Sequence, residues 1–142
     1  MSKKIVSALA GLILLLAAAA SVQARNTLSN QMQVTVPFKF AVSGQTFPAG
    51  IYVIELNTEH GTILLRTDGQ QPIMLQAMGK ESLAAPKHSQ LVFHRYGTSF
   101  FLTEVWTEGN TAGRTFATSD HEKELARKNT PDQKIVLAAR NQ

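Results

Sequence analysis

The segment LVFHRYGTSFFLTEVW, from Leu91 to Trp106, predicts a β-hairpin and with it an all-β fold. Gly97-Thr98 lies at its centre, and a Gly-X pair suits a two-residue type II′ turn. Such a turn determines the register, because residues equally distant from it face each other across the two strands. The predicted partners are Tyr96 with Ser99, Arg95 with Phe100, His94 with Phe101, Phe93 with Leu102, and Leu91 with Glu104.

Strict alternation divides this hairpin into two faces. The face with more large apolar groups is expected to point into the core, and it consists of Leu91, Phe93, Arg95, Phe100, Leu102, Glu104 and Trp106. The opposite, mixed face consists of Val92, His94, Tyr96, Ser99, Phe101, Thr103 and Val105. Arg95 and Glu104 lie too far apart along the strands for a direct ion pair, so each charge must reach solvent or another partner.

Further short strands are predicted along the rest of the chain. The clearest covers residues 34–42, where Pro37 indicates an edge strand or a bulge. Other strands are expected at 51–56, 62–67, 73–78, 114–118 and 135–139, with loops at 79–89 and 108–113. About seven or eight short strands predict an antiparallel β-sandwich or a small barrel.

One short helix is predicted near the C-terminus, over residues 120–128. Ser119 and Glu122 have the spacing of a capping box, and Asp120 and Glu122 suit the positive end of the helix dipole. Leu125 is the only large apolar residue of this segment. The helix is therefore expected to cover a surface rather than to build the core.

The N-terminus has the features of a secretory signal peptide over residues 1–24. Lys3 and Lys4 precede an almost wholly apolar run, and small residues precede a cleavage site after Ala24. The run is shorter than the ~20 apolar residues that a membrane span needs. The sequence therefore predicts a single β domain over residues 25–142, secreted or periplasmic, with no membrane span after cleavage.

Composition and motifs argue against several classes of function. The formal net charge of +4 is scattered, whereas a nucleic-acid-binding protein gathers basic residues on one face. The chain has no cysteine and no short metal-ligand spacing among its four histidines, so we expect neither a metal nor a cofactor. No nucleophile elbow or phosphate-binding glycine loop is present, so we expect no catalytic residue and no enzyme. A hydrolase would need His94 or His60 hydrogen-bonded to a carboxylate and a hydroxyl in a polar pocket.

Four residues of the hairpin are the candidates for ligand binding. His94, Tyr96 and Phe101 form an aromatic patch on the mixed face, and aromatic rings beside hydroxyl groups suit sugars or flat ligands. Arg95 is the fourth candidate, because no partner is predicted for its charge. Two other interpretations of the patch stay open, namely a half-exposed sheet face and a protein–protein contact.

Three segments resemble a family of small exported β-rich proteins of soil bacteria, to which no activity is assigned. They are VTVPFKFAVSGQTFPAGIYVI, LVFHRYGTSFFLTEVW and AGRTFATSDHEKELAR. The shared pattern is VPF-x-F, PAG-x-Y, an LVFHRYG hairpin and a GR…S-x-x-E-x-EL helix, with Phe47 where leucine is expected. The resemblance implies a secreted single domain and transfers no catalytic residue.

Two hypotheses of function follow from the sequence. The first is a non-enzymatic envelope domain with a structural or protein-interaction role, in which the strand that contains Pro37 is an exposed edge and accepts a strand of an envelope protein. The alternative is a module that binds a small, glycan-like ligand through the aromatic face of the hairpin.

Overall fold

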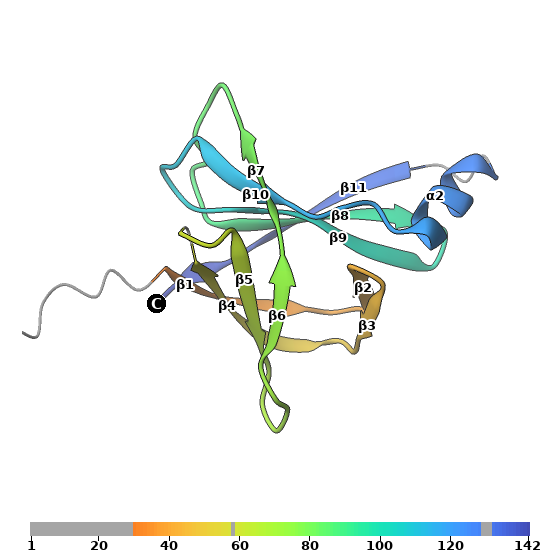
Figure 1. Ribbon diagram of the computed structural model, residues 1–142, viewed down its shortest axis with the longest axis horizontal. Coiled ribbons are helices and arrows are strands. Elements are labelled where there is room, and N and C mark those ends of the chain that lie inside the picture. Colours follow the sequence, from red (N-terminus) through yellow and green to blue (C-terminus); the bar gives the residue numbers. More distant parts are fainter. Residues whose placement is uncertain (1–29, 58, 129–131) are drawn as a thin grey trace, which may run out of the picture.

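The computed structural model describes residues 30–57, 59–128 and 132–142, so the predicted signal peptide lies outside the described residues. The described chain forms two β-sheets and one helix near the C-terminus (Figure 1). The elements are β1 (Gln31–Val36), β2 (Phe40–Val42), β3 (Gln45–Phe47), β4 (Gly50–Asn57), β5 (Thr62–Arg66), β6 (Ile73–Gln76), β7 (Met78–Glu81), β8 (Gln90–Tyr96), β9 (Ser99–Trp106), β10 (Ala112–Thr115), α2 (Asp120–Arg127), β11 (Asp132–Ala138) and β12 (Arg140–Asn141). The predicted all-β sandwich with a late helix is confirmed, and the described strands do not close into a barrel.

The first sheet is antiparallel and has the strand order β12-β1-β4-β5-β6. Between β5 and β6 the chain turns at Asp68-Gly69, where the Gln70 amide donates to the Thr67 carbonyl at 3.4 Å and Gly69 has a positive φ of 74°, which glycine adopts without strain. On the outer face, the carboxylate of Glu55 accepts from the Gln31 amide at 3.1 Å and from Arg66 at 3.2 Å. These contacts link three neighbouring strands, β1, β4 and β5.

The second sheet has the strand order β11-β8-β9-β10-β7. The small β2–β3 hairpin joins it through a parallel pairing of Ala41 with Phe101 on β9. β10 pairs with β9 further along, at Glu104 and Val105. One side of β9 is therefore shared by β10 and β2, and its other side is occupied by β8.

At some points the chain passes from one sheet to the other. There the structure has two strands where the sequence predicts one. The predicted strand over 34–42 divides at Pro37 into β1 and β2, because proline cannot donate to a ladder. The predicted strand over 73–78 divides at Ala77, whose amide donates to the Gly61 carbonyl at 3.0 Å. The predicted loop over 79–89 is wrong at its start, because residues 79–81 pair with β10.

The strand that contains Pro37 was predicted as an edge or a bulged strand, and β1 is an edge only in part. β12 pairs with Met32 and Gln33 on the outer side of β1. Beyond Gln33 no strand of the described residues continues this pairing. The outer side of β1 is therefore covered at its start and open near Thr35.

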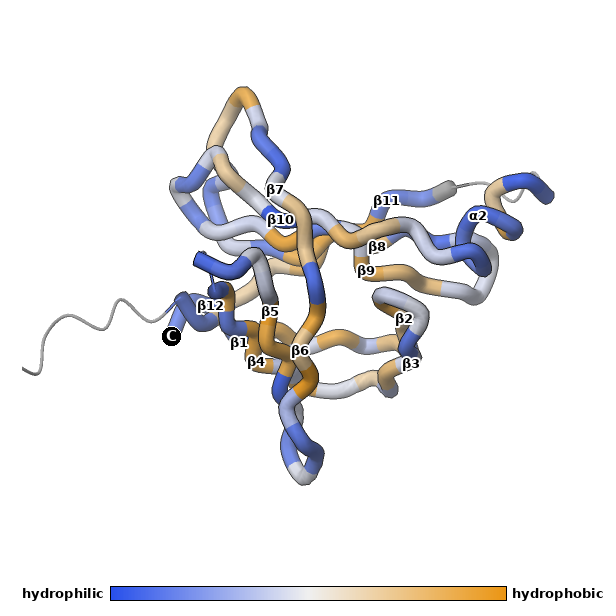
Figure 2. The backbone as a smooth tube through the Cα atoms, in the orientation of Figure 1, coloured by the Kyte–Doolittle hydropathy of each residue, from blue (hydrophilic) through white to orange (hydrophobic). Residues whose placement is uncertain are grey.

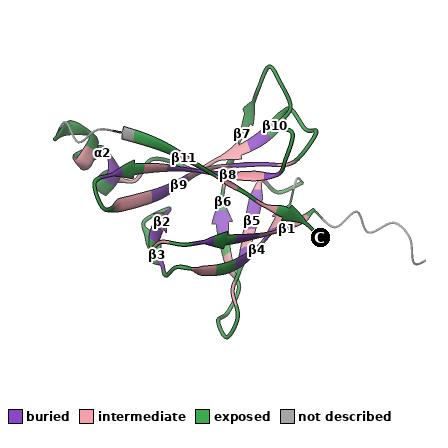
Figure 3. Ribbon diagram, turned by 180° about the vertical axis from the view of Figure 1, so that it is seen from behind, coloured by how far each residue is buried: buried purple, intermediate pink, exposed green. Residues whose placement is uncertain are grey.

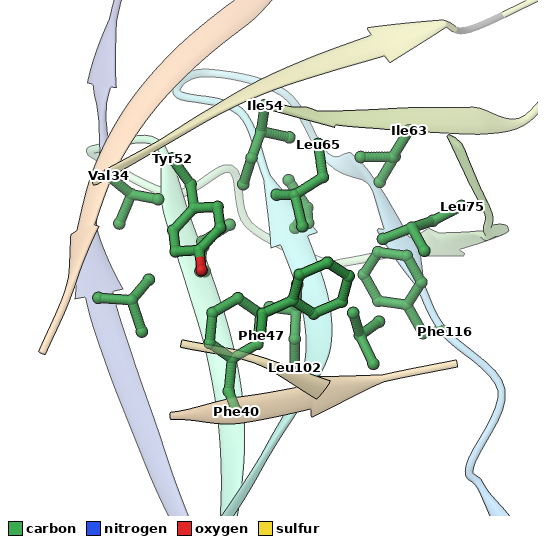
Figure 4. Packing of buried hydrophobic residues seen from close by; sticks show 14 of the residues in the cluster. Val34, Phe40, Phe47, Tyr52, Ile54, Ile63, Leu65, Leu75, Leu102 and Phe116 are labelled. Atoms are coloured by element: carbon green, nitrogen blue, oxygen red, sulfur yellow. The ribbon is translucent and has the colours of Figure 1, made fainter. Parts of the chain in front are cut away.

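Aromatic and aliphatic side chains fill the space between the two sheets (Figure 4). They come from the hydrophobic stretches of strands in both sheets (Figure 2). The ring of Phe40 lies 5.4 Å from Phe47, 5.3 Å from Tyr52 and 5.5 Å from Phe93. Phe93 has no exposed surface, and burial of such a side chain stabilises a fold by about 1.5–3 kcal/mol. The Tyr52 hydroxyl donates to the Pro48 carbonyl, and burial raises the pKa of Tyr52.

The helix α2 begins as predicted. The Ser119 hydroxyl accepts from the Glu122 amide at 3.2 Å, and Asp120 and Glu122 lie in the first turn. Leu125 is only partly buried, whereas Glu122 is buried. The helix therefore covers a surface, as expected, but it does so through a carboxylate.

Candidate functional site

The β8–β9 hairpin has the predicted turn and the predicted register near that turn. Gly97 has a φ of 62° and Thr98 does not have a positive φ, as a type II′ turn requires. Tyr96 pairs with Ser99, Arg95 with Phe100, His94 with Phe101, and Phe93 with Leu102. The turn therefore determines the four pairs next to it.

A β-bulge at Thr103 changes the register beyond these pairs. Phe93 faces Leu102, but Val92 faces Glu104, so Thr103 is an extra residue on β9. The Thr103 hydroxyl donates to the Val92 carbonyl at 3.0 Å. The Thr103 carbonyl accepts from the Phe116 amide at 3.0 Å and from the Thr115 hydroxyl at 3.1 Å, which stabilises the bulge.

The bulge reverses which side chains of β9 face the core beyond Thr103. Leu91 pairs with Val105 rather than with Glu104, and Val105 belongs to the core. The prediction that Glu104 and Trp106 share the core face is wrong, because one inserted residue reverses the alternation. Both side chains instead lie on the outer face, with Val92 and His94.

Two of the predicted ligand-binding residues, Tyr96 and Phe101, are buried at 8% and 4% exposure. Their rings contact each other at 5.9 Å, and the Phe101 ring lies 5.9 Å from His121 of α2. The helix lies against this end of the hairpin (Figure 1). A ligand could reach these two rings only if the helix moved away, so their role in binding stays a prediction.

His94 is the member of the patch that contacts a charged group. Its Nδ1 lies 3.2 Å from Oε1 of Glu122, and the Glu122 side chain is only 6% exposed. The adjoining cavity, next to Phe101 and Ser119, has a volume of about 10 Å³, which holds one water molecule at most. The histidine and the carboxylate that a hydrolase would need therefore lie in contact, and the cavity that Glu122 lines is too small to hold a substrate.

Arg95, the fourth candidate, lies on the opposite face from His94, Tyr96 and Phe101. Its Nε donates to the Gly97 carbonyl at 2.7 Å, and its guanidinium carbon lies 5.4 Å from the centre of the Phe100 ring. The turn carbonyl and the aromatic face supply the partner that the sequence did not indicate. The structure therefore brings His94, Tyr96 and Phe101 together and places Arg95 on the other face, and the role of all four in ligand binding stays a prediction.

The most site-like feature of the outer face is a hollow beside Trp106, with a volume of about 300 Å³. Its charged and polar lining comes from Lys80 and Glu81 of β7, from Ser82, and from Gln90 of β8, Glu104 of β9 and Lys134 of β11. We name this feature the Trp106 hollow. None of these residues is a predicted site residue. The sequence does not show the Thr103 bulge, which turns Glu104 and Trp106 to the outer face.

Glu104 organises the Trp106 hollow. One carboxylate oxygen pairs with the Lys80 ammonium, and the other accepts from the Trp106 indole at 2.7 Å. Burial by itself raises the pKa of Glu104, but hydrogen bonds from Lys80 and Trp106 and the charges of Lys80 and Lys134 outweigh it and lower the pKa. Glu104 is therefore ionised at neutral pH and holds the two neighbouring side chains in place.

A second hollow, of about 440 Å³, separates β1 from β11 and is lined by Gln33, Thr35 and residues 137–140. We name it the edge groove.

Within the described residues, no group of three histidine, aspartate or glutamate side chains could hold a metal ion. No helix in the same ranges has the length and hydrophobicity of a membrane span.

The fold and these surface features define a small all-β sandwich with one covering helix. Comparisons with protein-family models, with curated proteins and with solved structures gave no match. The resemblance to exported proteins of soil bacteria therefore stays a prediction from the sequence.

Proposed function

We propose that this chain is a secreted or periplasmic protein-interaction domain that accepts a strand of an envelope protein at the edge of β11. The predicted signal peptide supports export. The single observation that carries the proposal is a seven-residue edge strand, β11, that has a partner strand on one side only within the described residues.

The register shows which backbone groups of β11 are open. The Ala139 amide donates to the Ser89 carbonyl at 2.7 Å, so the backbone of Ala139 points toward the β8 side. Backbone groups alternate in direction along an antiparallel strand, so those of residues 133, 135 and 137 also point to β8. The amides and carbonyls of Lys134, Val136 and Ala138 therefore point away from the sheet, where an added strand can pair with them.

The edge groove offers room beside this open edge. The Gln142 amide donates to the Gln31 carbonyl at 3.0 Å, so the alternate residues Gln33 and Thr35 also direct their backbone groups to the outer side of β1. Much of β11 is exposed (Figure 3), including 48% of Val136. A partner strand would obtain backbone hydrogen bonds from β11 and side-chain contacts from the groove.

Proline scanning of the open edge tests the proposal. In Val136→Pro, the lost amide is one that points away from β8, so the pairing of β8 with β11 persists while an added strand loses a donor. A photo-crosslinking amino acid at position 138, in cells that export the protein, should give a discrete adduct in the wild type and in Val136→Thr. The adduct should disappear in Val136→Pro.

Three controls decide the outcome. The same crosslinker at Asn57, an exposed residue at the far end of β4, should give no such adduct. Urea unfolding must show that Val136→Pro remains folded. An adduct that persists in Val136→Pro, or none at position 138, contradicts the proposal, and light scattering shows whether the partner is a second copy.

A further inference from the structure

The Trp106 hollow has the composition of a small-molecule site rather than of a strand-binding edge. Its floor is apolar, formed by Val92 and by Trp106, which is 6% exposed. Its rim carries two ammonium groups, Lys80 and Lys134, together with the carboxylate of Glu81, the hydroxyl of Ser82 and the amide of Gln90. A volume of about 300 Å³ lies at the lower end of the range for ligand pockets.

The walls of the hollow are held by contacts that do not need a ligand. The Ser82 amide donates to the Thr111 carbonyl at 2.8 Å, and the Gly109 amide donates to the Pro86 carbonyl at 3.0 Å. These bonds tie the loop that follows β7 to the turn between β9 and β10. On the other side, the backbone of Gly113 packs so closely on the indole that an added Cβ would lie 2.5 Å from it. A site formed in advance loses little conformational entropy on binding.

The charged groups of the hollow indicate which kind of ligand it can bind. Glu104 already holds Lys80 and the indole, so it acts as a fixed anion between two cations. Lys134 lies across the hollow from Lys80 and has no ion-pair partner within 4.0 Å among the described side chains. A carboxylate on a ligand would satisfy Lys134, and hydroxyl groups would satisfy Gln90 and the remaining lone pairs of Glu104.

An apolar ligand would leave the Lys134 ammonium without a partner. A sugar that carries a carboxylate suits the hollow. Its anion matches Lys134, its vicinal hydroxyls match Gln90 and Glu104, and its apolar C–H face matches the apolar floor. We propose that the Trp106 hollow binds a uronic acid residue of an acidic polysaccharide, with Lys134 on the carboxylate and Glu104 and Gln90 on the hydroxyls. This site is separate from the strand-binding edge in its ligand and in its test.

Trp106 is the only tryptophan of the chain, so its fluorescence reports on this hollow alone. Titration of the purified protein with a galacturonic acid trimer should change the emission to saturation, and calorimetry should give the same Kd. The matched neutral galactose trimer and sodium acetate should bind at least tenfold more weakly. Raising the salt concentration should weaken the binding of the acidic trimer, because Lys134 is exposed.

The variant Lys134→Gln removes the unpaired cation without touching the core, and it should raise the Kd for the acidic trimer at least tenfold. Lys123→Gln, an exposed lysine on α2, is the matched control and should leave the Kd unchanged. The proposal is overturned if calorimetry shows no binding, if acetate or the neutral trimer binds as tightly, or if Lys134→Gln binds like the wild type.

Discussion

Nδ1 of His94 on β8 lies 3.2 Å from Oε1 of the buried Glu122 on α2, and this contact attaches the helix to the outer face of the sheet. The Glu122 side chain is 6% exposed, whereas the remainder of the helix has a single large apolar residue, Leu125. Because α2 has so little apolar surface to bury, a polar contact has a large share in holding it.

Glu122→Ala should therefore destabilise the protein by about 1.5–3 kcal/mol, the contribution of a hydrogen bond to a charged group. The measurement is the free energy of unfolding in urea. Glu124→Ala is the control, because Glu124 pairs only with exposed Lys128 at 3.3 Å and such pairs contribute about 0.3–0.5 kcal/mol. Equal losses in the two variants would show that the His94 contact does not anchor the helix.

Ser119→Ala should lower the free energy of unfolding by about 1 kcal/mol, because the Glu122 amide loses its cap. The neighbouring exposed Thr118, changed to alanine, provides the control and should have little effect. Helical circular dichroism and urea unfolding measure both. A loss in Thr118→Ala as large as in Ser119→Ala would argue against a specific role of the cap.

Gly113→Ala should destabilise the protein by about 1–3 kcal/mol, since the new methyl group would overlap the Trp106 indole. Gly79, on the paired strand, is a matched control, because its added Cβ would meet Arg114 at an ordinary 3.6 Å. Alanine in place of a strand glycine normally stabilises, so Gly79→Ala should have the opposite sign. Unfolding followed by Trp106 emission measures both, and a stabilising Gly113→Ala would contradict the packing.

The lowered pKa of Glu104 predicts a specific loss of stability in acid. Its contribution is complete above the unfolded pKa of about 4.5 and is lost as the pH falls through the lower folded pKa. Between pH 7 and pH 3 the wild type should therefore lose more stability than Glu104→Gln, which has no charge to lose. Urea unfolding at a series of pH values checks this, with Glu108→Gln, in an exposed turn, as the control. Parallel curves for wild type and Glu104→Gln would refute it.

Local rules correctly predicted the elements whose geometry depends on near neighbours. The positive φ of Gly97 follows from the lack of a side chain, and the four pairs next to the turn follow from that turn. The start of α2 follows in the same way from the spacing of Ser119 and Glu122. In each case the interacting groups lie within a few residues of one another in the chain.

The candidate site was predicted less well, and the reason is a single residue. Thr103 forms a bulge because its carbonyl accepts from β10, a strand that comes later in the chain. No local pattern indicates that contact, so strict alternation placed Glu104 and Trp106 on the wrong face. Likewise, nothing near Tyr96 in the sequence shows that a distant helix covers its face of the sheet.

The sequence by itself determined the class of this protein: alternating apolar residues and glycine turns specify short strands, and these must bury one face in a sandwich. Only the tertiary structure decided which groups remain available to a partner. Availability depends on how segments far apart in the chain are brought together: β11 brings Lys134 to the hollow that Glu104 also lines, and among the described residues it has a partner strand on one side only. These arrangements arise from packing and register rather than from local preference.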